Sequence, residues 1–458
     1  MSAPLIWIVF PGLVAVILFI IRRWERGIVI AGTAICAALA WLAWKLPINE
    51  VVEAGPWSIK VSDTLSVFGR QFIIEDANRP IVALVFLSAA FWFGGALASH
   101  AGKMFVPLGL GIVTLMTAAL SVEPFLYAAL LIEMAALVCV PLLAPPGKNI
   151  GLGIIRFLTF QTLGTPFILF TGWMLAGLDV NPGDQSLIFR AGILMALGFC
   201  FLLAVFPFHS WIPMLAQDAH PYAAAFVFFM LPGIVSLFGL GFLERYPWIR
   251  SLPSLYPLLR SAGVLMILTG GIWAAFQRHL GRMLGYAVTV DIGISLLAAG
   301  LFTGDPSSTG ENASLQSIFF SLLIARGLGL GVWSLALSGL KRHLGDLNYK
   351  TVQGAARSYP ITAGSLILAH FSIAGFPLLG GFPTHLAIWE HLGQISPLLA
   401  FWVVTGCAGL LTGGIRTLAV LVMGQEEEPW QFQEKGILLF FLIAGVLALF
   451  LSGMFPRG

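Results

Sequence analysis

The chain has 458 residues, of which 58% are hydrophobic and only 10% are Asp, Glu, Lys or Arg. An ordinary soluble domain has about 25% charged residues, so this composition excludes a water-exposed surface of the usual kind. The formal net charge of +3 is too small and too dispersed for a nucleic-acid-binding protein. We therefore expect a protein that is surrounded mostly by the lipid bilayer.

Apolar runs of about twenty residues recur along the chain, and each is long enough to cross a membrane as a helix. Charges or clusters of Gly and Pro bound these runs, which predicts an all-α integral membrane protein with about fourteen transmembrane helices. The expected spans are residues 4–21, 27–44, 80–98, 104–121, 124–144, 152–176, 187–206, 221–243, 256–276, 283–302, 314–338, 360–376, 397–422 and 436–453.

Basic residues predict the orientation of these spans. Lys and Arg gather in the odd-numbered loops, for example in residues 22–26 and 341–357. Since basic flanks are retained on the cytoplasmic side, we expect both termini to lie outside. Between the second and third spans, the alternating residues 57–61 are typical of a short extracytoplasmic hairpin.

The cysteines give no sign of a redox or metal site. Cys36, Cys139, Cys200 and Cys407 each stand alone in an apolar run without CxxC spacing, and we interpret them as small core residues. The histidines lack a metal-binding spacing with an acid, and dinucleotide-binding and Walker motifs are absent. We therefore predict that this chain binds no cofactor and no metal, and that its chemistry is transport.

Two spans are followed by a pair of prolines with the same spacing, Pro207 with Pro213 and Pro377 with Pro383. Proline removes a helical donor, so each segment is predicted to be a broken helix. The breaks lie five spans apart, which predicts two inverted five-helix repeats, an architecture typical of translocators. Chance recurrence among 26 prolines is the alternative. The predicted domains are residues 1–103 with three spans and the hairpin, 104–243 as the first repeat, 256–422 as the second, and 436–458 as the C-terminal span.

Ionisable side chains at mid-bilayer cost about 2.5 to 3.5 kcal/mol, so each one needs a partner, water or a function. Glu133 lies in the fifth span and Asp291 in the tenth, so each repeat contributes one acid from its second helix. Such a carboxyl favours its neutral form and can carry a proton. A Glu held neutral by a neighbouring helix is the alternative. Arg326 either pairs with Asp291 and fixes both charges or biases a moving proton, and both readings stay open.

Histidines lie beside both breaks, with His209 and His220 after the first and His385 after the second. Histidine titrates near neutrality, which suits proton relay through an interrupted helix, although a lone His is often an ordinary core residue. The predicted proton path consists of Glu133, Asp291, Arg326, His385, His209, His220 and Asp218.

Residues 206–213 read FPFHSWIP, and Glu133 lies in the fifth span. These features resemble the PFHxWLPDA stretch and the fifth-span glutamate of the antiporter-like membrane subunits of respiratory complex I. Those subunits share a fold with the large subunits of Mrp-type sodium/proton antiporters and of membrane-bound hydrogenases. Residues 282–286, RMLGY, are similar to KRxLAYSS, and residues 375–382 are similar to the GxPPxxGFxSK break. The resemblance covers residues 100–420.

The resemblance implies an antiporter-like subunit of an NADH-quinone oxidoreductase-type complex in the bacterial cytoplasmic (inner) membrane. Protons would move through a central polar axis. The implied partners are other membrane subunits of the complex. Electrons would run in partner subunits of the complex, with no redox centre on this chain.

The departures from the family concern its lysines. Leu202 stands at the position of the family's seventh-span lysine, and Gly331 lies near the position of its eleventh-span lysine. The family's eighth-span lysine or histidine falls within residues 228–233, which are all uncharged here. His385 replaces the family's twelfth-span lysine. These changes suggest either a rebuilt path or a structural subunit that does not pump protons, whereas Glu133 and Asp291 favour pumping. A stand-alone cation/proton antiporter or an inorganic-carbon uptake subunit on the same fold is a further alternative.

Overall fold

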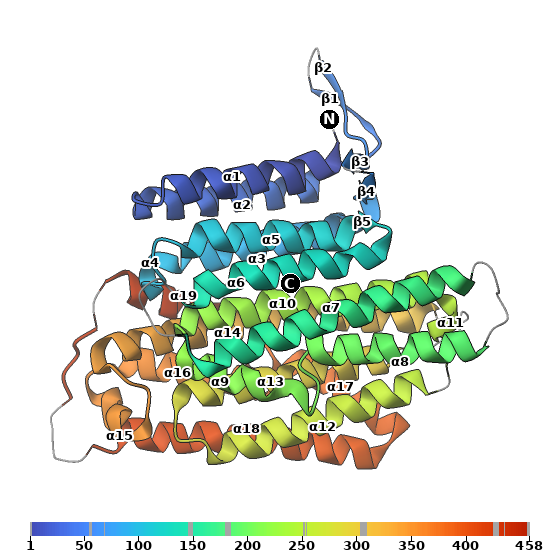
Figure 1. Cartoon of the computed structure of the whole chain (residues 1–458). Coiled ribbons are helices and arrows are strands. Elements are labelled where there is room, and N and C mark those ends of the chain that lie inside the picture. Colours follow the sequence, from blue (N-terminus) through green and yellow to red (C-terminus); the bar gives the residue numbers. More distant parts are fainter. Residues whose placement is uncertain are drawn as a thin grey trace. The chain divides into compact units, whose positions relative to one another are not determined.

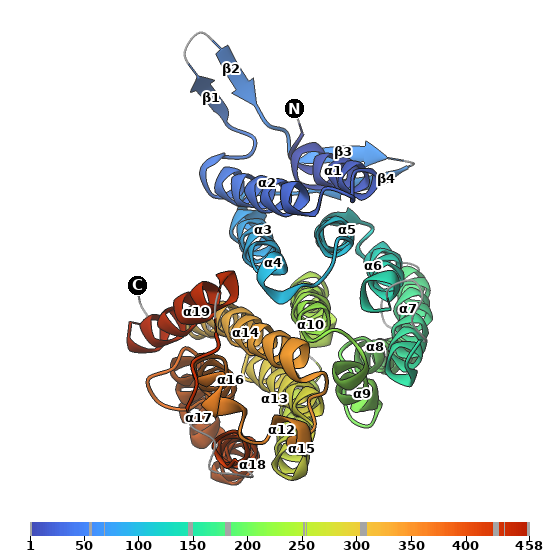
Figure 2. The same cartoon turned by 90° about the vertical axis from the view of Figure 1, so that its left-hand side faces the viewer.

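The computed structural model describes residues 2–54, 57–67, 69–144, 150–178, 185–250, 252, 254–302, 309–424, 430–434 and 436–455. Contacts between residues divide the chain into two compact units. Unit 1 comprises Met1–Asn149 and Leu158–Leu202, and unit 2 comprises Ile150–Phe157 and Leu203–Gly458. Both units consist mainly of helices (Figures 1 and 2).

Unit 1 contains the helices that the first apolar runs form. In the long elements hydrophobic residues continue for several turns. The helical elements are η1 (Leu5–Val9), α1 (Phe10–Ile20), α2 (Glu25–Lys45), η2 (Asp76–Asn78), α3 (Arg79–Gly94), α4 (Ala96–Ser99), α5 (Phe105–Ser121), η3 (Phe125–Tyr127), α6 (Ala128–Leu143), α7 (Leu152–Leu178), whose first residues belong to unit 2, and α8 (Gln185–Leu202).

Short strands connect α2 to α3. β1 (Val51–Ala54) pairs antiparallel with β2 (Trp57–Lys60), and this hairpin projects away from the helices of unit 1 (Figures 1 and 2). β3 (Thr64–Val67) pairs with β4 (Arg70–Ile73), which pairs in turn with β5 (Val122–Glu123). Residues 57–60 of the alternating run thus form one strand of a hairpin, as the sequence predicts.

Unit 2 contains the remaining helices. Its elements are η4 (Phe208–Ser210), α9 (Trp211–Asp218), α10 (Pro221–Arg245), α11 (Pro247–Arg250), α12 (Leu255–Phe276), α13 (Leu280–Gly300), α14 (Thr309–Leu344), α15 (Tyr349–Val352), η5 (Ala355–Arg357), α16 (Pro360–Ile373), α17 (Phe382–Ile395), α18 (Pro397–Val422) and α19 (Ile437–Met454).

The described residues include ten helices that are long and apolar enough to cross a membrane. Their burial differs widely, since 89% of the apolar window in α13 is buried and only 17% of the window in α19. Large apolar side chains such as Trp24, Trp173 and Phe276 are more than two-thirds exposed. Lipid solvates such side chains, so the chain is an integral, multi-pass membrane protein.

Glycines let three helices of unit 2 approach one another closely. A Cβ atom at Gly271 in α12 would overlap the carbonyl oxygen of Gly406 in α18. About two turns earlier in α12, a Cβ atom at Gly263 would lie 2.6 Å from the carbonyl oxygen of Gly293 in α13. Small residues of this kind allow van der Waals packing of helix backbones within a membrane. They fix α13, the most buried of the ten long helices, between its neighbours.

Candidate functional site

The first pair of prolines interrupts the helical structure where the sequence predicts a break. α8 ends at Leu202 and α9 begins at Trp211, with the η4 turn between them. His209 lies in this turn, half-buried, and its ring stacks on Phe206 with the centroids 5.5 Å apart. The indole of Trp211 is buried against the rings of Phe157 and Phe228, which anchors the start of α9 in unit 2.

α9 packs directly on the helix that carries Asp291. Cβ atoms at Gly281 and Gly285 of α13 would lie 2.5 Å from the Ala216 carbonyl oxygen and the Pro213 Cα atom, respectively. Both glycines are therefore needed for this close contact. The interruption before α9 thus leads directly into a close contact between α9 and α13 within unit 2.

Two of the proposed path residues lie at the end of α9. The Asp218 carboxylate accepts a hydrogen bond of 3.1 Å from the backbone N–H of Gly153, in the first turn of α7. This is the position of a helix-capping anion. His220 is the residue before α10, and its carbonyl oxygen accepts the N–H of Ala224 at 2.9 Å.

The second pair of prolines also coincides with an interruption, between α16 and α17. Gly375 adopts a φ of +77°, and a Cβ atom there would lie 2.9 Å from the His385 ring. The Ser372 hydroxyl oxygen accepts the N–H of Gly381 at 3.2 Å, which closes the interruption. His385 itself is 2% exposed.

The hydrogen bond that His385 makes defines its tautomer. Its Nδ1 lies 2.7 Å from the Gly381 carbonyl oxygen, which can only accept a hydrogen bond, so Nδ1 carries the proton. In the neutral ring Nε2 is then unprotonated. This buried Nε2 has no hydrogen-bond partner among the described residues. His385 therefore presents a proton-accepting nitrogen inside the protein.

Asp291 and Arg326 form a buried ion pair, so the pairing that the sequence left open is made. Asp291 in α13 is 4% exposed and Arg326 in α14 is 2% exposed. The guanidinium Nε contacts the Asp291 carboxylate, and Nη2 donates to the Asp291 carbonyl oxygen at 3.0 Å and to the Ser295 hydroxyl. Two opposite charges in an apolar interior compensate each other only with such additional hydrogen bonds.

The packing of α14 on α16 places this ion pair at the depth of the second interruption. His370 in α16 stacks on Trp333 in α14 with 4.3 Å between centroids, and a Cβ atom at Gly329 would lie 2.9 Å from Ile373. The two helices therefore run in opposite directions. Arg326 lies one turn before Gly329 in α14. Because the two helices are antiparallel, Arg326 lies at the height of the residues that follow Ile373.

Glu133 belongs to unit 1, where it is half-buried in α6. It shares a helix face with Leu130 and Leu137, which are 41% and 45% exposed. Its carboxyl has no hydrogen bond to a described residue. The sequence could not predict which way this side chain faces, because that depends on the neighbours of α6.

The seventh-span lysine position of the family is occupied by a packed Leu202. Its side chain is 1% exposed and lies against Gly164 of α7. The Gln161 side-chain amide donates to the Leu202 carbonyl oxygen at 3.2 Å. Gln161 is a buried polar residue that the pattern of ionisable groups does not indicate, because its side chain carries no charge.

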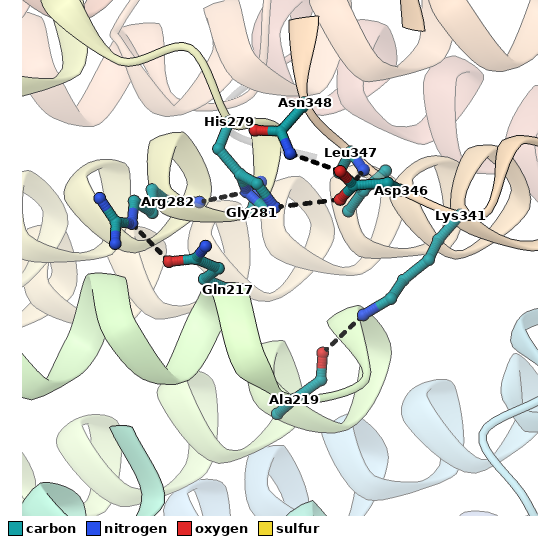
Figure 3. A network of polar contacts seen from close by, with 9 residues as sticks. All are labelled: Gln217, Ala219, His279, Gly281, Arg282, Lys341, Asp346, Leu347 and Asn348. Atoms are coloured by element: carbon teal, nitrogen blue, oxygen red, sulfur yellow. Dashed lines mark hydrogen bonds and ion pairs between the residues drawn. The ribbon is translucent and has the colours of Figure 1, made fainter. Parts of the chain in front are cut away.

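A polar network joins the ends of α9, α13 and α14 (Figure 3). The Arg282 Nε donates to the Gln217 side-chain oxygen at 2.5 Å, and the Lys341 Nζ donates to the Ala219 carbonyl oxygen at 3.2 Å. The His279 ring lies 3.6 Å from the Asp346 carboxylate. The two partners of each contact are 65 to 122 residues apart, so no local sequence pattern indicates the network.

Within the described ranges, no three His, Cys, Asp or Glu side chains come together as a metal site. All four cysteines are free, with three buried and Cys200 half-buried.

Comparisons with known proteins agree on one family. The transmembrane family described as NADH:quinone oxidoreductase/Mrp antiporter matches residues 157–412. NADH-quinone oxidoreductase subunit N of Rhodopseudomonas palustris (strain BisA53) is 32% identical over 350 residues, covering 75% of this chain and 68% of that protein. Subunit N of Pelagibacter ubique is 26% identical over 292 residues, or 62% of this chain and 59% of that protein. The chain therefore spans about three-fifths of the Pelagibacter relative.

Solved structures show the same fold at low sequence identity. A chain of respiratory complex I from Thermus thermophilus with bound NADH superposes with a TM-score of 0.71 at 21% identity, covering 99% of this chain and 95% of that one. A chain of the Mrp complex from Dietzia sp. superposes with a TM-score of 0.79 at 14% identity, covering 100% and 95%. Both proteins are multi-subunit membrane complexes.

Proposed function

Since the chain belongs to the NADH:quinone oxidoreductase/Mrp antiporter family, we propose that it is an antiporter-like membrane subunit of an NADH-quinone oxidoreductase-type complex and moves protons across the membrane. Other membrane subunits of that complex are among its partners, and electron transfer takes place in partner subunits rather than on this chain. The family match and the fold shared with subunits of such assemblies support this placement.

The proposed architecture has fourteen spans and two inverted five-helix repeats, residues 104–243 and 256–422. In support, four shorter apolar helices accompany the ten long ones, and ten plus four is fourteen. Each proposed repeat also includes one interrupted helix. With basic residues in the odd-numbered loops, both termini lie outside the bacterial cytoplasmic membrane.

The observation that carries the transport proposal is the unprotonated Nε2 of His385 at the depth of a buried ion pair. Arg326 neutralises Asp291, so this ion pair leaves no net charge in that part of unit 2 before a proton arrives. A proton that enters the central polar axis is accepted by Nε2 and released on the other side of the interruption. An imidazole nitrogen suits this step because it can both accept and release a proton.

Glu133 is the proposed carrier in the first repeat. The neutral Leu202 cannot act as the family lysine does, so Glu133 has to exchange its proton without a neighbouring cation at that position. His209, His220 and Asp218 surround the first interruption and complete the proposed path. An intramembrane carboxyl with no protein partner in the described chain fits a role in transport rather than one in holding helices together.

A structural subunit that does not conduct is the second candidate. Two observations favour it, because Arg326 fixes the Asp291 charge and Leu202 fills the lysine position with apolar packing. A permanently closed ion pair between Asp291 and Arg326 does not move protons. The two candidates differ in the effect of a neutral replacement of Glu133 on proton uptake.

The proposal is tested with the purified complex in sealed vesicles, in which NADH oxidation drives proton uptake. Replacing Glu133 with Gln keeps the size of the side chain and removes its titration. We expect Glu133→Gln to decrease proton uptake per NADH oxidised, while Glu390→Gln, an exposed site in α17, leaves it unchanged. Equal uptake in both variants would support the structural subunit instead.

A further inference from the structure

The first turn of α13 is capped by a histidine ring. His279 has the extended backbone of an N-cap residue, with φ −128° and ψ 119°. Its Nδ1 accepts hydrogen bonds from the backbone N–H groups of Gly281 at 3.1 Å and Arg282 at 3.4 Å (Figure 3). Asp, Asn, Ser and Thr usually take this role, with a side-chain oxygen as the acceptor. A histidine cap differs because its acceptor is also its protonation site.

The cap requires one protonation state of the ring. Since Nδ1 accepts two N–H groups, it carries no proton, and the proton of the neutral ring is on Nε2. Nε2 lies 3.6 Å from the Asp346 carboxylate, which can accept it. A second proton would occupy Nδ1 and face two backbone donors. The protonated ring therefore cannot cap α13 in this position.

One acidic and two basic side chains influence His279. Asp346, in the loop after α14, has a side chain that is 52% exposed, whereas the His279 side chain is 10% exposed. Arg282 in the same turn and Lys341 at the end of α14 are the facing cations. α9 contributes the uncharged Gln217 side chain to this network, and Ala219 directly after it contributes a backbone carbonyl group.

These surroundings keep the ring neutral at neutral pH. Burial is the largest influence and lowers the pKa of His279. Asp346 opposes this decrease, while the cations Arg282 and Lys341 add to it. The cap is therefore present near pH 7 and is lost on acidification.

We propose that His279 is a titratable positioning residue, whose neutral ring holds the first turn of α13 against α9 and whose protonation releases that turn. The released imidazolium turns toward Asp346 and forms a charged pair with it. The capped turn includes Gly281, which lies against Ala216 of α9, and Arg282, which binds Gln217. Acid on this side of the membrane thus loosens the junction between α9 and the helix that carries Asp291.

This inference goes beyond the proposed function and can be tested without measuring transport. Hydrogen–deuterium exchange of the peptide that begins α13 is measured on the full chain in its complex, in lipid, at about pH 7.5 and about pH 5.5. Rates are divided by the intrinsic exchange rate at each pH. The relevant amides are those of Gly281 and Arg282, because the His279 ring accepts a hydrogen bond from each of them.

His279→Asn is the matched variant, because Asn caps a helix without titrating in this range. We expect the protection of these amides to decrease roughly fivefold at the lower pH in the wild type, the equivalent of one typical N-cap, and to stay constant in His279→Asn. His279→Ala should lack the protection at both pH values. Equal protection of the wild type at both pH values would overturn the proposal, as would an equal loss in His279→Asn.

A second variant keeps the proposal testable if His279→Asn does not assemble. Asp346→Asn removes the carboxylate that favours the protonated ring and leaves the cap in place. We expect the pH at which the α13 amides lose protection to move downward in Asp346→Asn. An unchanged or higher midpoint would contradict the role given to His279.

Discussion

Asp291 and Arg326 depend on each other for their place in the interior of unit 2. Each is almost fully buried, and each would be an uncompensated charge without the other. The guanidinium also donates to the Asp291 carbonyl oxygen at 3.0 Å, so it holds backbone as well as side chain. The pair therefore connects α13 to α14 beside the second interruption.

Removing one partner should cost far more than removing both. We expect Arg326→Met to lower the free energy of unfolding by about 3 to 5 kcal/mol, because Asp291 then remains buried without a counter-charge. The double variant Arg326→Met with Asp291→Leu should recover most of this loss. Thermal unfolding of the purified chain in detergent measures both variants. A single variant as stable as the wild type would show that the pair is not compensating buried charge.

Asp218 offers a test that separates capping from proton transfer. Its carboxylate accepts the Gly153 N–H, which an Asn side-chain oxygen can also do. We expect Asp218→Asn to retain stability and Asp218→Ala to lose about 1 kcal/mol in thermal unfolding. If Asp218 also carries protons, Asp218→Asn lowers proton uptake in vesicles without lowering stability. Normal uptake in Asp218→Asn would remove this residue from the proposed path.

At the scale of helices, unit 2 is held by backbone contacts that only glycine permits. The crossing of α12 with α18 has Gly271 against Gly406, where even one methyl group would overlap a carbonyl oxygen. The sequence shows these glycines only as members of apolar runs. Their role depends on which helices become neighbours, and a single sequence does not contain that information.

Gly271→Ala should therefore destabilise the crossing of α12 with α18. We expect a loss of about 1 to 3 kcal/mol, typical of overpacking, measured as a lower unfolding temperature in detergent. Gly364→Ala in α16 is the matched control, since a Cβ atom there meets nothing within 4 Å. That control should be neutral or slightly stabilising, because Ala favours a helix more than Gly does. Equal effects of the two substitutions would contradict the close crossing.

The start of α13 should make stability depend on pH. Burial lowers the pKa of His279 from its ordinary 6.5, so the folded chain binds fewer protons there than the unfolded chain. Stability from this group is therefore complete above about pH 6.5 and decreases as the pH falls toward the folded pKa. Below about pH 6.5 we expect wild-type thermal stability to fall more steeply than that of His279→Asn. Parallel curves would contradict the titrating cap.

At the scale of the whole molecule, apolar runs predict most helices well because the bilayer requires continuous hydrophobic segments. The proline pairs at Pro207 and Pro377 likewise predict the two interruptions, since proline cannot continue the hydrogen bonding of a helix. The interaction partners of the buried polar groups are harder to predict from the sequence. Asp291 and Arg326 are 35 residues apart, and only the packing of α13 on α14 decides that they meet.

The central claim is that this chain conducts protons past His385, and the most direct measurement is the number of protons moved per NADH oxidised by the complex in sealed vesicles. His385→Asn should lower that ratio while the rate of NADH oxidation by the detergent-solubilised complex stays normal. His391→Asn, in the same helix α17, should leave the ratio unchanged. A wild-type ratio in His385→Asn would contradict the claim and identify the chain as a structural subunit.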